Sequence, residues 1–98
     1  MTITKTQEND KLTVSIEGRL DTTTARRLEA VLKSSLDNVK ELVFDIKELE
    51  YISSAGLRVL LAAQKVMNRQ GKMIITGTSE TVMEIFEVTG FVDILNIE

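Results

Sequence analysis

Two adjacent hydroxyl side chains, Ser53 and Ser54, precede an apolar run in this sequence and are its best candidates for chemistry. A serine just before a helix can be an N-cap, whose side-chain oxygen accepts hydrogen bonds from the free backbone N–H groups of the helix start. It can also accept a phosphate, because those N–H groups and the helix dipole favour negative charge. A phosphoserine adds about −1.5 to −2 charges and can disrupt the binding of an acidic or apolar partner.

The residue types that are missing exclude several classes of protein. The 98 residues include no Cys and no His, which excludes disulfides, thiolate nucleophiles, Ser-His-Asp triads and metal sites built on Cys or His. The compact acidic cluster of Asp45, Glu48 and Glu50 is expected to be exposed, and no Gly-rich phosphate loop is present. We therefore predict that the protein is not an enzyme and holds no metal and no cofactor.

Charge and hydropathy limit the partners. The formal net charge is −3 and the pI is about 5.0, whereas a surface that binds nucleic acid directly is normally basic. No apolar run approaches the ~20 residues of a membrane span, and the N-terminus does not resemble a signal peptide. We predict a cytoplasmic protein, without direct contact to nucleic acid or membrane, whose residues 1–98 form a single domain.

The elements that must position the two serines follow from hydrophobic periodicity. In chain order we predict strands over 2–7 and 11–16, a helix over 22–36, a strand over 41–46, a helix over 55–69, a strand over 72–76, a helix up to about 88 and a short apolar segment over 91–97. The order β-β-α-β-α-β-α-(β) indicates an α/β fold with a small mixed sheet of four or five strands and three or more helices.

Several local signals refine these boundaries. Gly18 is predicted to end the second strand, and residues 47–52 to be a connection that leads to Ser53. Asp21 or one of the threonines at 22–24 is expected to cap the first long helix. The last helix is expected to begin at Ser79 or at Thr81, which has capping-box spacing to Glu84.

Two residues near the serines have predicted structural roles. Asp45 ends the probable central strand and is expected to accept hydrogen bonds from the backbone of residues 53–55. Gly56 is expected to let the start of the helix pack closely against a neighbouring backbone.

The sequence DIKELEYISSAGLRVLL at residues 45–61 resembles the signature of the STAS family, which contains the bacterial anti-sigma factor antagonists. GRLD at 18–21, followed by Ala25 and Leu28, resembles the second motif of the family. KMIITG at 72–77 and IFEVTGF at 85–91 resemble its C-terminal part. The resemblance covers nearly the whole chain in the right order and implies a single-domain STAS-like fold.

The resemblance also implies a switch controlled by phosphorylation. In the family, the unphosphorylated antagonist binds an anti-sigma factor, often one with serine kinase activity, and a sigma factor is released. The kinase phosphorylates a serine at the helix start, and a PP2C-type phosphatase reverses the step. Alignment on Gly56 places the acceptor at Ser54. The usual Asp of the motif falls on Ser53, which is the second candidate, and Ala55 cannot accept a phosphate.

The resemblance further implies a partner-binding surface around the acceptor. Arg58 lies one turn into the predicted helix and could contact a phosphate or an acidic partner, and Asp21 matches an acidic position in a partner-facing loop. The predicted partner-binding residues are Asp21, Thr22, Thr23, Ser53, Ser54, Ala55, Gly56 and Arg58.

One alternative function stays open on the sequence alone. A STAS subunit can bind its partner without phosphorylation, within a scaffold or an ABC-type lipid transport complex. In either case we expect a monomer or a weak dimer formed through an exposed sheet edge.

Overall fold

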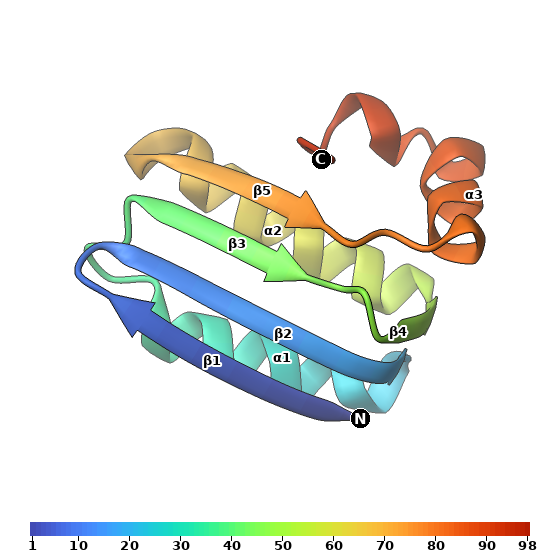
Figure 1. The fold of residues 1–98 in the computed structure, drawn as a ribbon, viewed down its shortest axis with the longest axis horizontal. Helices are drawn as coiled ribbons and strands as arrows, with labels where there is room; N and C mark the ends of the chain where they lie inside the picture. Colours follow the sequence, from blue (N-terminus) through green and yellow to red (C-terminus); the bar gives the residue numbers. More distant parts are fainter.

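The polypeptide forms a five-stranded sheet with two long helices packed along one face, in a computed structural model that describes residues 1–98 (Figure 1). The elements are β1 (Thr2–Glu8), β2 (Lys11–Leu20), α1 (Thr22–Ser35), β3 (Glu41–Asp45), β4 (Leu49–Ile52), α2 (Ser54–Gln70), β5 (Lys72–Thr76), α3 (Glu80–Thr89) and the 3-10 helix η1 (Phe91–Asp93). The predicted α/β class and element order are confirmed, with one strand added.

The strand order β1-β2-β3-β5 makes the sheet mixed. β1 is antiparallel to β2, while β3 pairs parallel with both β2 and β5. Because parallel neighbours need a crossover connection, α1 links β2 to β3 and α2 links β4 to β5. Both helices lie on the far side of the sheet in Figure 1, and α3 lies near β4 beyond the end of β5.

The core lies between the sheet and this helix layer. Alternate residues of β2 and β3 point toward α1 and α2, so that Leu12, Val14, Leu42 and Phe44 are all fully buried. Strand pairing aligns a row of alternating charges at Glu8, Lys11, Glu41 and Lys72, a row that includes Lys11 and Lys72, which are exposed. The face away from the helices is therefore more polar.

The prediction that the second strand ends at Gly18 is wrong. β2 continues to Leu20, and its register shifts between Gly18 and Arg19, where Gly18 adopts a φ of 102°. A bulge of this kind needs a residue that tolerates positive φ. The last three residues of β2 pair in parallel with β4, which lies within the segment 47–52 that was predicted to be a connection. β2 thus has β3 beside its first half and β4 beside its last three residues.

The C-terminal part confirms one of the two predicted starts of the last helix and differs from the prediction in its final segment. The N-cap of α3 is Ser79, whose Oγ accepts a hydrogen bond from the backbone N–H of Val82 at 3.2 Å, and Thr81 already lies inside the helix. Gly90 ends α3 in a left-handed conformation, as expected. The following apolar segment forms η1 and then one isolated bridge between Ile97 and Ile75, not a full strand.

No helix here combines the length and the apolar character that crossing a bilayer requires.

Candidate functional site

The candidate site begins where two parallel strands end side by side. Leu20 at the end of β2 is paired with Ile52 at the end of β4, and the backbone N–H of Ser53 donates to the carbonyl of Leu20 at 2.8 Å. Each strand is followed by a single residue and then by a helix. Asp21 therefore lies next to Ser53, and the N-termini of α1 and α2 open on the same end of the sheet.

The start of α1 is closed by a reciprocal set of hydrogen bonds. Asp21 Oδ1 accepts from the backbone N–H groups of Thr23 and Thr24 at 3.1 and 3.0 Å, and Thr24 Oγ1 accepts from the N–H of Asp21 at 2.8 Å. These hydrogen bonds, those from Thr24 above all, lower the pKa of the Asp21 carboxyl because they favour its charged form. Asp21 is thus the cap of α1.

The start of α2 divides its two hydroxyl groups between different environments. Ser53 is the N-cap, and its Oγ accepts from the backbone N–H of Gly56 at 3.3 Å. Ser54 is the first helical residue; its side chain is exposed, and its hydroxyl has no hydrogen-bond partner in the structure. The cap and the free hydroxyl are therefore different residues.

Gly56 lies below the surface and allows α2 to approach the two strand ends. A Cβ at this position would lie 2.8 Å from Ile52 Cγ1 and from Leu20 Cγ, which is closer than real Cβ atoms come. The close contact is with side chains, not with a neighbouring backbone as predicted. Gly56 is buried and Ala55 is half-buried, so Gly56 shapes the surface from below.

Arg58 lies on the exposed side of α2, one turn after Ser54, and forms no ion pair. With Thr22 and Ala55 it lines a hollow between the first turns of α1 and α2. Arg26 lines the same hollow and was not among the predicted site residues. Its spacing of four residues from Thr22 places both on one face of α1, a signal that the sequence did contain.

Asp45 does not contact the serines. Its Oδ1 accepts from the backbone N–H of Lys47 at 3.2 Å, and its Oδ2 lies 3.4 Å from Lys47 Nζ. Asp45 therefore stabilises the turn between β3 and β4, and the predicted bonds to residues 53–55 are wrong.

The remaining feature near the site is a contact between a guanidinium and an aromatic ring. The Arg19 guanidinium lies 4.4 Å from the centre of the Tyr51 ring across β2 and β4. No three acidic side chains are grouped so that they could hold a metal ion.

Comparison with known proteins agrees with this geometry. The family model described as STAS domain matches residues 2–98. BtrV of Bordetella bronchiseptica is 34% identical, with 99% of this chain and 85% of that protein covered. The anti-sigma-B factor antagonist of Listeria monocytogenes is 32% identical, with 96% of this chain and 84% of that protein covered.

Solved structures share the fold. The anti-sigma factor antagonist SpoIIAA in its unphosphorylated form superimposes with a TM-score of 0.86 at 16% identity, over 99% of this chain and 88% of that one. The phosphorylated form of SpoIIAA from Bacillus gives a TM-score of 0.78 at 15% identity, over 99% and 91% of the two chains. At this identity the structures show the fold alone. The match of the family model and the two relatives above 30% identity show that this chain belongs to the STAS domain family, together with anti-sigma factor antagonists.

Proposed function

We propose that this protein is an anti-sigma factor antagonist that is switched by phosphorylation of Ser54. Its partner is an anti-sigma factor with serine kinase activity, which binds the end of the sheet where α1 and α2 begin. Unphosphorylated protein binds this partner, so that a sigma factor is released. Phosphorylation ends the complex, and a PP2C-type phosphatase restores it. The partner-binding residues are those around Ser54, namely the half-buried Asp21 and Ala55 and the exposed Thr22, Thr23 and Arg58.

The observation that carries the proposal is the division of roles between the two serines. Ser53 Oγ is held in the cap by its bond from the Gly56 N–H, whereas the Ser54 hydroxyl is exposed and unbonded. A kinase can modify Ser54 without removing the cap of α2. This ranks Ser54 above Ser53 as the acceptor.

The surroundings of Ser54 suit a phosphate on the folded protein. The first turn of α2 contains no acidic side chain, and Arg58 lies one turn further on the same helix. The helix dipole and a nearby guanidinium both stabilise a phosphate. Phosphorylation would then change the charge of the surface and leave the fold intact.

The departure from the usual family motif concerns the cap. The position where the family usually has Asp is Ser53, and this side chain caps α2. Ser and Asp are about equally good N-caps. The exchange therefore keeps the geometry of the helix start that presents Ser54.

The test is a phosphorylation assay with the cognate anti-sigma kinase, followed by measurement of intact mass and mapping of the modified residue. Wild type and Ser53→Ala are expected to gain one phosphate, and Ser54→Ala none. Ser54→Asp is expected to lose binding to the kinase. Modification of Ser54→Ala to the wild-type level would assign the acceptor to another residue. Wild type that stays unmodified, with unchanged binding by Ser54→Asp, would favour a STAS subunit that works without phosphorylation.

A further inference from the structure

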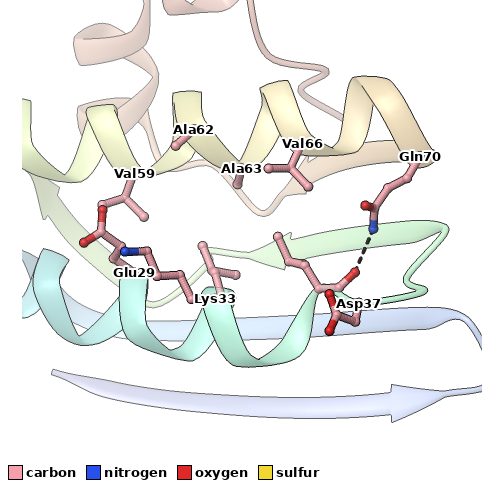
Figure 2. A pocket seen from close by; sticks show the side chains of 10 residues that line it. Glu29, Lys33, Asp37, Val59, Ala62, Ala63, Val66 and Gln70 are labelled. Carbon is pink, nitrogen blue, oxygen red and sulfur yellow. Dashed lines mark hydrogen bonds between the residues drawn. The ribbon is translucent and has the colours of Figure 1, made fainter.

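A groove lies between α1 and α2 (Figure 2). Its far part has a volume of about 310 Å³ and is lined by Glu29, Leu32, Lys33, Leu36, Asp37, Val59, Ala62, Ala63, Val66 and Gln70. The hollow beside Arg58 shares Glu29, Val59 and Ala62 with this part, so the two hollows adjoin and we treat them together as the groove. At the far end, Gln70 Nε2 donates to the carbonyls of Leu36 and Val39, both at 2.7 Å.

The dimensions and lining of the groove suit a helix. Measured along α1 from Thr22 to Asp37, it is about 22 Å long, the length of roughly four helical turns. The α2 side is built from small apolar side chains, among them Ala62 and Val66, and Val66 is 37% exposed. Figure 2 shows Val59 pointing from α2 toward α1. A shallow apolar groove of this length can accommodate apolar side chains that repeat every three to four residues on a partner helix.

The two helices that form the groove are net positive, whereas the rest of the chain is net negative. α1 and α2 together contain one acidic side chain, Glu29, and six basic ones, so their formal charge is +5. The whole chain is −3, so the remaining residues carry −8. Of the six basic side chains, Arg26, Lys33 and Arg58 line the groove, together with the acidic Glu29 and Asp37.

We infer that the groove binds an amphipathic acidic helix of the anti-sigma factor partner, an inference that rests on the proposed function. The apolar face of this helix packs on the groove, and its acidic flanks face Arg26, Lys33 and Arg58, the basic side chains that line it. The mouth of the groove lies at Ala55, next to Ser54. One partner can therefore contact the phosphorylation site and the groove together.

The inferred groove supplies a reason why phosphorylation would release the partner. A phosphate on Ser54 would add negative charge at the mouth, close to Arg58 and Arg26. It would lower the positive potential that attracts an acidic helix and would repel the nearest acidic side chain.

The probe is a synthetic peptide of about 18 residues, about five helical turns, with Leu at helical spacing on one face, Glu on both flanks and Gln elsewhere. Binding is followed by two-dimensional NMR of the labelled protein. We expect shifts at groove residues, a Kd on the order of 10–100 µM at low salt, and weaker binding as salt increases. A matched peptide with Lys in place of Glu should bind about tenfold more weakly.

Two valine variants form a matched pair. Val66→Glu places a carboxylate in the groove, and Val88→Glu places one on α3, where the side chain is 80% exposed. Glu favours helix at both positions, and circular dichroism verifies folding. Val66→Glu should weaken peptide binding about tenfold and Val88→Glu less than about twofold. Equal losses, equal binding of the Lys peptide, or no shifts at 1 mM peptide would overturn the inference.

Two further measurements separate this inference from its alternatives. Binding of the peptide does not require phosphorylation, so an unmodified Ser54 in the kinase assay leaves a positive peptide result standing. Ser54→Asp should weaken peptide binding about threefold through charge alone. Analytical ultracentrifugation at the same protein concentrations tests for self-association. A doubling of mass that Val66→Glu removes would assign the groove to a second copy of this chain and overturn the inference.

Discussion

The starts of α1 and α2 have the same place in the fold and opposite hydrogen-bonding states. Both follow parallel strands that end side by side at Leu20 and Ile52. At α1, the carboxylate of Asp21 is bonded to two backbone N–H groups and Thr24 bonds back. At α2, Ser53 makes one cap hydrogen bond of 3.3 Å, and the next hydroxyl, on Ser54, makes none.

The proposed phosphorylation of Ser54 would place stability and switching on neighbouring helix starts. A side chain such as Asp21, whose Oδ1 accepts several hydrogen bonds, holds the local structure, and its modification would destabilise the fold. An exposed, unbonded hydroxyl can be modified at little expense to the fold. The closed start of α1 thus provides a rigid neighbour for the open start of α2.

The largest expected effect comes from the apolar contact beneath both helix starts. Leu20→Ala should lower the free energy of unfolding by about 2–5 kcal/mol because the side chain is fully buried. Gly56→Ala should lower it by about 1–3 kcal/mol, because its Cβ would lie 2.8 Å from Leu20 Cγ. The double variant should lose less than the sum of the two in urea unfolding, since each change relieves the other. Strict additivity would show that the Cβ added by Gly56→Ala does not clash with Leu20.

The second effect tests the two caps directly. Ser53→Ala should lower the free energy of unfolding by about 1 kcal/mol, a typical value for a lost N-cap. Asp21→Ala should lower the urea midpoint further, because it removes the acceptor for two backbone N–H groups and the partner of Thr24. A smaller decrease in the urea midpoint for Asp21→Ala than for Ser53→Ala would show that the cap of α1 is not the stronger of the two.

The third effect is a pH dependence confined to the start of α1. The pKa of Asp21 is lowered in the folded protein, so its contribution to stability is fully present above the unfolded pKa of about 3.9. This contribution is lost as the pH falls through the lower folded pKa. Asn at this position also caps a helix but does not titrate. The difference in stability between wild type and Asp21→Asn should therefore change below about pH 4 and stay constant above it. A difference independent of pH would contradict this.

The smallest effect is expected at Ser54 itself. Ser54→Ala removes a hydroxyl without a hydrogen bond from an exposed position, so the free energy of unfolding should change by less than about 0.5 kcal/mol. Urea unfolding beside Ser53→Ala provides the control. A loss as large as that of Ser53→Ala would mean that Ser54 shares the cap.

Periodicity and capping residues predicted the order of the elements, the long helices and the segment that contains Ser54. They could not predict β4, because a four-residue strand is defined by its pairing with the end of β2, after a bulge at Gly18. The same distant pairing decides that Asp21 and Ser53 are neighbours. Asp45 was misplaced because the turn at Lys47 satisfies its carboxylate locally. The groove depends on the spacing of two helices, which neither helix sequence contains alone.

Because of the Gln70 side chain, the C-terminal and the N-terminal turns of α1 and α2 should differ in how they unfold locally. By bonding to the carbonyls of Leu36 and Val39, the last turn of α2 holds the chain that leaves α1. Helix ends normally fray independently, with low local unfolding free energies. Here the C-terminal turns of α1 and α2 should open as one cooperative unit and protect their amides from exchange together. The N-terminal turn of α2, held by one side-chain cap, should open alone while the rest of the molecule stays folded.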